Sequence, residues 1–196
     1  MPRAADAETA FTRSALLVID VINDLDFDGG EALGPFAEEL VGPILTLKRR
    51  FREAGLPVIY VNDNFGNWRS DFRATVDAVC GRACRGRAIA RALKPEDEDL
   101  FVLKPKHSGF HHTVLPLLLH DLGVDRVVLC GIAGNICVAF TAHDALMHNL
   151  RVAVPRDAVA SESSDANDRV LGELEDVFGV DTRPAAEVAV EPPAPG

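Results

Sequence analysis

Short apolar runs alternate along the chain with longer segments whose apolar residues recur at helical spacing. The predicted strands cover residues 15–19, 58–61, 100–103, 126–130 and 152–154, with a short sixth strand at 180–182. The predicted helices cover 35–55, 74–93 with a break at Gly81 and Gly86, 112–122, 137–150 and 165–178. The first run, Ala-Leu-Leu-Val-Ile, is continuously apolar, as expected of a strand covered on both faces. This alternation is typical of βαβ units and predicts an α/β fold with a parallel sheet.

The pattern extends over most of the chain without a repeat or a second domain. A length of 196 residues is enough for one α/β domain with a full core. We therefore predict a single domain over residues 1–183. Residues 184–196 are rich in Pro, Ala and Glu, which predicts a mobile tail.

Charge and hydropathy narrow the classes of function. The chain has 20 Lys and Arg against 30 Asp and Glu, a net charge of −10, which argues against binding to nucleic acid or to an anionic membrane surface. Its apolar runs are too short to span a membrane, and residues 1–13 do not resemble a signal peptide. We therefore expect a cytoplasmic enzyme that acts on a small-molecule substrate.

The four cysteines, Cys80, Cys84, Cys130 and Cys137, are expected to be thiols rather than a disulfide framework. Cys80 and Cys84 are four residues apart, so they are either half of a metal site or two incidental thiols. Because the chain has no second pair of ligands at metal spacing, we favour incidental thiols. Cys130 lies within a predicted strand and is assigned to the core.

Cys137 follows a predicted strand and a turn that contains Gly131 and Gly134. A thiol at the start of a helix has its thiolate stabilised by the helix dipole and by free N–H groups, which lowers its pKa. The same N–H groups can hold an oxyanion. Cys137 is therefore either the nucleophile of an acyl-transfer enzyme or, like most free cysteines, a small core residue.

Two further reactive side chains follow other predicted strands. Asp20 ends the first strand and Lys104 ends the third. Ligands of open α/β sheets bind beyond the carboxyl ends of the strands, so these residues and Cys137 are expected at one edge. Asp20 would serve as base and then acid, and Lys104 would stabilise charge. The N–H groups of Ala133 and Cys137 would form the oxyanion hole. Alternatively, Asp20 is a turn residue and Lys104 a solvated lysine. Lys104 must also reach across the second strand.

Three motifs resemble those of the isochorismatase-like cysteine hydrolases, which include nicotinamidases and N-carbamoylsarcosine amidases. The motifs lie at residues 20–24, 104–110 and 131–145, and a later Asp-Ala pair lies at 157–158. The resemblance covers residues 14–183. It implies a three-layer α/β/α sandwich with six parallel strands in the order 3-2-1-4-5-6 and an Asp20, Lys104 and Cys137 triad. It also implies a non-proline cis peptide before Ala133 and a homodimer or homotetramer.

The chain departs from this family in two places. Leu25 occupies a position where the family usually has Phe, which changes the expected pocket wall. Nicotinamidases of the family carry an Asp-x-His metal motif after the second strand, but residues 62–69 contain Asp63 and no histidine. We therefore predict no metal or other cofactor and no nicotinamidase activity. True isochorismatases lack the cysteine, so Cys137 argues against that activity as well.

Candidate substrate contacts lie in the loops near these motifs: Phe27, Asn64, Phe65, Trp68 and Phe110. Trp68 is either a substrate wall, a subunit contact or a packing anchor for its own loop. His107, His111 and His112 flank the lysine motif, but adjacent histidines do not easily share a metal, so we do not assign a metal site there.

The leading hypothesis is a metal-independent cysteine hydrolase that cleaves a small amide or related C–N bond through a thioester. An alternative is a catalytically silent family member that binds a small ligand or a protein partner, because a fold does not determine function. A dinucleotide-binding protein is disfavoured, because the glycines at 131 and 134 do not form the G-x-G-x-x-G fingerprint.

Overall fold

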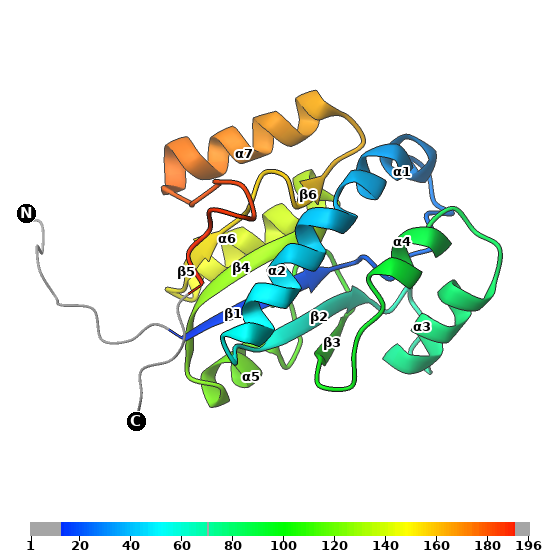
Figure 1. Cartoon of the computed structure of the whole chain (residues 1–196), viewed down its shortest axis with the longest axis horizontal. Coiled ribbons are helices and arrows are strands. Elements are labelled where there is room, and N and C mark those ends of the chain that lie inside the picture. Colours follow the sequence, from blue (N-terminus) through cyan, green and yellow to red (C-terminus); the bar gives the residue numbers. More distant parts are fainter. Residues whose placement is uncertain (1–12, 70, 191–196) are drawn as a thin grey trace, which may run out of the picture.

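The computed structural model describes residues 13–69 and 71–190 (Figure 1). The central sheet is parallel throughout, and the order of five of its strands is β3-β2-β1-β4-β5. The strands are β1 (Arg13–Ile19), β2 (Val58–Asp63), β3 (Leu100–Lys104), β4 (Val124–Ile132), β5 (Arg151–Ala153) and β6 (Val159–Ala160). The predicted α/β class with a six-stranded parallel sheet is confirmed.

The sixth strand differs in position from the prediction. β6 pairs with the end of β4, through Gly131 with Val159 and Ile132 with Ala160, whereas β5 pairs with residues 126–128 of β4. The predicted strand at 180–182 is reduced to one bridge, between Asp181 and Ala153 of β5. Two short strands therefore share one side of the long strand β4.

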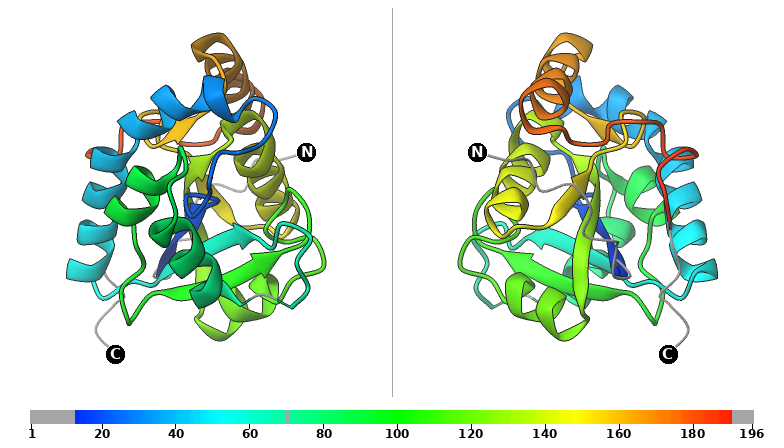
Figure 2. Two further views of the ribbon diagram at one scale, coloured as in Figure 1. Left: turned by 90° about the vertical axis from the view of Figure 1, so that its right-hand side faces the viewer. Right: turned by 90° about the vertical axis from the view of Figure 1, so that its left-hand side faces the viewer.

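Helices cover both faces of the sheet, which gives the predicted three layers (Figure 2). One face is covered by α1 (Gly30–Glu39), α2 (Val41–Glu53), α3 (Phe72–Gly81) and α4 (Arg87–Ala92). The other face is covered by α5 (Leu115–Asp121), α6 (Ala139–Met147) and α7 (Ser164–Phe178). Alternate residues of β1 serve the two cores: Leu16 and Val18 pack on the first face, and Leu17 and Ile19 on the second.

The ends of α7 follow local sequence signals, but the start of the first helix does not. Ser163 caps α7 by accepting a hydrogen bond from the Ala166 N–H, and α7 ends at Gly179, which has a left-handed conformation. The helix predicted to begin at Pro35 is instead two helices that meet at Leu40, with Pro35 inside the first. Gly29, with φ +93°, allows the chain to turn into α1 before Pro35.

Residues 184–190 are packed against the domain, so the mobile tail predicted from composition is wrong for this segment. Ala185 and Val188 are buried, and the Arg50 guanidinium of α2 donates to both of their carbonyls. The Ala185 N–H also donates to Asp157, at 2.7 Å. Small apolar side chains and satisfied carbonyls thus extend the folded unit to residue 190. The rest of the predicted tail, residues 191–196, lies outside the described residues.

Gly131 allows β1 and β4 to approach closely beside the turn that carries Cys137. It pairs with Ile19 and has φ +116°, a conformation that side-chain-bearing residues rarely adopt. A Cβ atom at this position would lie 2.0 Å from the carbonyl oxygen of Ile19. The glycine therefore fixes the direction in which the chain leaves β4.

None of the helices formed by residues 13–69 and 71–190 combines the length and apolar character needed to cross a bilayer.

Candidate active site

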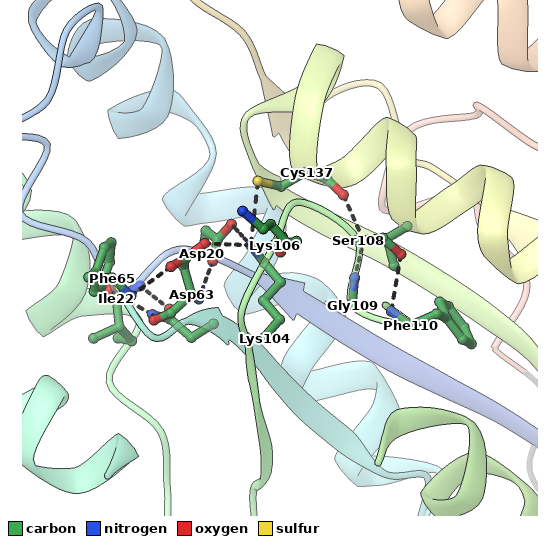
Figure 3. A network of polar contacts seen from close by, with 12 residues as sticks. Asp20, Ile22, Asp63, Phe65, Lys104, Lys106, Ser108, Gly109, Phe110 and Cys137 are labelled. Carbon is green, nitrogen blue, oxygen red and sulfur yellow. Dashed lines mark hydrogen bonds and ion pairs between the residues drawn. The ribbon is translucent and has the colours of Figure 1, made fainter. Parts of the chain in front are cut away.

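Asp20, Lys104 and Cys137 lie together beyond the carboxyl ends of β1, β3 and β4 (Figure 3). The Lys104 ammonium is completely buried, 2.9 Å from Asp20 Oδ2 and 3.5 Å from Cys137 Sγ. Its side chain therefore spans the end of β2, which lies between β1 and β3 in the sheet. Reactive groups that are far apart in sequence form one contact network through this reach.

The backbone turns sharply at Asp20. Its φ is +51°, a left-handed conformation that Asp tolerates better than most residues, and its N–H donates to the carbonyl of Val61. The side chain lies at the edge of the sheet, where Oδ1 accepts a 2.6 Å hydrogen bond from the Asp63 N–H. Both carboxylate oxygens thus have fixed partners, and Asp20 is held beside Lys104.

Asp63 is a residue of this network that sequence reasoning missed. Its Oδ2 lies 3.3 Å from Lys104 Nζ, and its Oδ1 accepts a 2.6 Å hydrogen bond from the Phe65 N–H. From sequence, the chemical role considered for Asp63 was that of a metal ligand. Its place at the end of β2, between the strands that end in Asp20 and Lys104, is the signal that would have identified it.

The turn that presents Cys137 begins with the non-proline cis peptide between Ile132 and Ala133 that the resemblance implies. It continues as a π-helical turn, Gly134–Val138, that leads into α6. The N–H groups of Ile136 and Val138 both donate to the Ala133 carbonyl at 3.1 Å. Single π-turns are frequent at functional sites, and this one places the thiol at the start of a helix.

Thr141 joins the cysteine turn to the loop after Lys104. Its Oγ1 donates to the Cys137 carbonyl at 2.6 Å and accepts from the Gly109 N–H at 3.0 Å. On the other side of the turn, Ser161 Oγ accepts from the Asn135 N–H at 3.1 Å. The position of the thiol is therefore fixed by hydrogen bonds from two directions.

The electrostatics of Cys137 are opposite to the sequence-based expectation. Burial and the neighbouring Asp20 carboxylate raise the pKa of the Cys137 thiol to about 12, against the opposing effect of Lys104. Desolvation and the nearby negative charge both disfavour the thiolate. Cys137 is a thiol in the resting site at neutral pH, so its use as a nucleophile requires a base.

The two partners of Cys137 are also perturbed. Burial raises the pKa of Asp20 above its usual value, although Lys104 opposes that rise. Burial lowers the pKa of Lys104, but Asp20, Cys137 and Asp63 outweigh it and leave that pKa raised. A buried carboxylate that binds protons more readily suits the role of accepting the thiol proton.

The raised thiol pKa predicts that Cys137 lowers stability at alkaline pH. Above the ordinary thiol pKa of 9.0 the unfolded chain releases this proton, whereas the folded protein retains it to about 12. The wild-type protein should therefore lose about 1.4 kcal/mol of unfolding free energy per pH unit in this window, relative to Cys137→Ala. Urea denaturation at pH 8, 9 and about 10.5 measures this difference. Parallel pH dependence of the two proteins would contradict the raised pKa.

The predicted substrate contacts do not all lie near the thiol. Phe27 lines a cavity of about 100 Å³ beside the cysteine turn, together with Ala133, Ile136 and Glu162. Phe110 is buried in the second core and its ring stacks on His148 at 5.0 Å, so it points away from Cys137 (Figure 3). The structure therefore places Phe27 beside the cysteine turn and Phe110 in the core.

The loop after β2 contains the remaining predicted contacts. Asn64 is buried and braces this loop: its N–H donates to the Lys104 carbonyl and its Oδ1 accepts from the Gly66 N–H. Phe65 is half-exposed, and Trp68 is 80% exposed. A side chain this exposed does not anchor its own loop by packing. Trp68 is therefore either a substrate wall or a subunit contact.

The other reactive side chains are outside the network. Cys80 and Cys84 are half-buried free thiols, and Cys130 is a buried one. The rings of His111 and His112 lie edge to face at 4.4 Å, and His107 packs against Phe140. Across residues 13–69 and 71–190, no group of three or more His, Cys, Asp or Glu side chains is arranged to hold a metal ion.

Comparisons with known proteins agree with this fold. The isochorismatase domain profile matches residues 14–184. The isochorismatase family protein YaaI of Bacillus subtilis (strain 168) is 42% identical over 164 residues, which cover 84% of this chain and 90% of YaaI. Maleamate amidohydrolase of Pseudomonas putida is 28% identical over 175 residues, which cover 85% of this chain and 81% of that protein.

A solved structure has a similar fold. The N-carbamoylsarcosine amidase from Thermoplasma acidophilum superposes with a TM-score of 0.70 and is 32% identical in sequence. The match covers 91% of this chain and 100% of the amidase. The profile match and the YaaI relationship each extend over most of the domain, and the structural match includes the parallel sheet. The chain therefore belongs to the isochorismatase family of hydrolases.

Proposed function

We propose that the chain is a metal-independent cysteine hydrolase that cleaves a small amide or a related C–N bond through a thioester intermediate. The observation that carries this proposal is the buried Lys104 ammonium, in contact with the Asp20 carboxylate at 2.9 Å and with the Cys137 thiol at 3.5 Å. The names of two relatives, maleamate amidohydrolase and N-carbamoylsarcosine amidase, support hydrolysis of a C–N bond. The absence of histidine from residues 62–69 supports chemistry without the Asp-x-His metal motif.

In the first step, Cys137 Sγ attacks the carbonyl carbon of the substrate while Asp20 takes the thiol proton. The carbonyl oxygen becomes an oxyanion, which the N–H groups of Ala133 and Cys137 stabilise, and one such donor contributes about 3–4 kcal/mol. Lys104 lies between Asp20 and the sulfur and offsets the negative charge that moves from one to the other. This step explains how a thiol with a raised pKa acts at neutral pH.

In the second step, protonated Asp20 gives its proton to the leaving nitrogen, the C–N bond breaks, and an acyl-thioester remains on Cys137. Water then attacks the thioester carbonyl while Asp20 accepts a proton from it. The C–S bond breaks, the acid leaves, and the proton returns to the sulfur. One water is consumed for each acid and amine, or ammonia, released.

An ammonia-release screen over small amides, ureides and carbamoyl compounds tests the proposal, with Cys137→Ala as the blank. We expect at least one class to release ammonia from the wild-type protein above that blank. Release at equal rates from the wild-type protein and the blank would contradict a cysteine mechanism.

The same thiol environment also suits the alternative of a catalytically silent member that binds a small ligand or a protein partner. Its supporting observation is the pKa of about 12, because a thiol that stays protonated is unreactive without a working base. Mass spectrometry of the protein incubated with small amides separates the two functions. The hydrolase forms an acyl adduct on the peptide that carries Cys137, and the silent member does not.

The cytoplasmic location and the homodimeric or homotetrameric state expected from the sequence belong to the same proposal. Exposed aromatic side chains, namely Phe65, Trp68 and Phe140, support association with another copy of the chain.

A further inference from the structure

We propose that Asp63 is a positioning residue of this site, which holds the Lys104 ammonium in place and shares its charge with Asp20 and Cys137. The inference rests on the proposed function, because it concerns the same network. It assigns a role to a carboxylate that is neither the proton acceptor nor the nucleophile.

Lys104 Nζ has more acceptors than it has protons. It lies 2.9 Å from Asp20 Oδ2, 3.1 Å from the Lys106 carbonyl, 3.3 Å from Asp63 Oδ2 and 3.5 Å from Cys137 Sγ. An ammonium group has three N–H donors, so these four acceptors compete for it. Asp63 therefore draws the ammonium partly away from the sulfur.

The charges of the network also indicate that Asp63 disfavours the Cys137 thiolate. Asp20 and Asp63 both face one ammonium, so the network with a neutral Cys137 thiol already has a net charge of −1. Ionisation of the thiol, with both carboxylates charged, would place three negative groups around one buried cation. Asp63 thus suppresses the thiolate until Asp20 takes up the proton.

The two carboxylates differ in their surroundings. The Asp20 side chain is 6% exposed and the Asp63 side chain is 28% exposed. Charge on a desolvated carboxylate is disfavoured, so burial favours Asp20 as the proton acceptor. When Asp20 is protonated during the reaction, the Asp63 side chain remains beside the Lys104 ammonium.

Backbone contacts fix Asp63 in this place. Asp63 pairs with Lys104 in the β2–β3 register, and its N–H donates to Asp20 at 2.6 Å. Its second carboxylate oxygen accepts from the Phe65 N–H, so the side chain cannot rotate away without breaking that bond. Asp63 is therefore held in contact with Lys104, unlike a solvated surface acid whose side chain is free to rotate.

The test is the pH dependence of Cys137 alkylation by iodoacetamide, followed by mass spectrometry of the peptide that carries Cys137. Asp63→Asn removes one negative charge and keeps the shape of the side chain. We expect the pH of half-maximal alkylation to fall by about one unit in this variant, because the thiolate gains a larger share of the Lys104 charge. Asp63→Glu restores the charge and should return the midpoint toward the wild-type value.

Asp77→Asn is the matched control, since Asp77 is an exposed acid on α3 with no contact to Lys104. A midpoint that does not move in Asp63→Asn, or that moves equally in Asp77→Asn, would overturn the proposal. If Asp63→Asn does not fold, as judged by circular dichroism, Asp63→Ser removes the same charge and gives the same comparison.

The alkylation experiment needs no substrate and no turnover. A protein in which Cys137→Ala leaves ammonia release unchanged would disprove the proposed function, and the alkylation midpoints would still report on Asp63. Conversely, an active enzyme with identical midpoints in all variants would disprove the role of Asp63 alone.

Discussion

Replacement of Cys137 by alanine is expected to lower kcat by about 10⁴-fold or more while the protein stays folded. The variant has no atom that can form the thioester, so both the first attack and the later hydrolysis are lost. The fold should survive, because the deleted sulfur is only partly buried and its polar partners are side chains of the site itself, the Lys104 ammonium at 3.5 Å and the Asp20 carboxylate. Steady-state ammonia release and circular dichroism measure the two properties.

Cys84→Ala is the matched control for this variant. Cys84 is also a half-buried free thiol, but it follows α3 and its Sγ lies 3.6 Å from the Val79 carbonyl, outside the Lys104 network. It should retain the wild-type kcat. Full activity in Cys137→Ala would sink the proposed mechanism, and equal losses in both variants would point to an effect on folding instead.

The largest expected effect on stability comes from Gly131→Ala, which should cost about 4 kcal/mol or more. The new Cβ would lie 2.0 Å from the Ile19 carbonyl oxygen, and φ of +116° is unfavourable for alanine as well. Relief would require β1 and β4 to separate where they pair at Ile19 and Gly131. Urea denaturation at neutral pH measures the loss of unfolding free energy.

Gly123→Ala separates the cost of the steric clash from the cost of the positive φ. Gly123 also has a positive φ, of +65°, but a Cβ there would have no atom within 4 Å. Its cost should be about 1 kcal/mol, the contribution of backbone conformation alone. Equal costs at Gly131 and Gly123 would show that the close approach of the two strands has little energetic weight.

The alternation of apolar runs and helical segments was sufficient to predict the α/β class and the parallel sheet, whereas the three layers and the strand order came from the family resemblance. Strands buried on both faces are continuously apolar, and residues 15–19 of β1 and 127–130 of β4 show this pattern. Short elements were harder to predict. β6 contains only Val159 and Ala160, and its pairing depends on the end of β4 rather than on its own sequence.

The position of the three reactive side chains could be predicted from sequence, but the electrostatics of the site could not. Asp20, Lys104 and Cys137 could be placed at one edge because each follows a strand. The direction of the thiol pKa shift could not be predicted, because it depends on desolvation and on the Asp20 carboxylate, which are properties of the folded site. Asp63 was overlooked for a similar reason, since its contact with Lys104 arises from strand register.

Sequence alone also misjudged side chains whose surroundings come from distant segments. Phe110 belongs to a motif next to Lys104, but its ring packs on His148 at the end of α6. Residues 184–190 have the composition of a tail, but Arg50 of α2 binds two of their carbonyls. In both places, tertiary contacts outweigh the local pattern.

The protonated resting state of Cys137 also bears on the lifetime of the protein in an oxidising cell. Peroxides react with thiolates and hardly with thiols, and oxidation beyond the sulfenic acid is irreversible for most cysteines. A thiol with a pKa of about 12 is therefore expected to resist peroxide in the resting protein. The sulfur is most open to oxidation as a thiolate, which forms only when its proton is transferred.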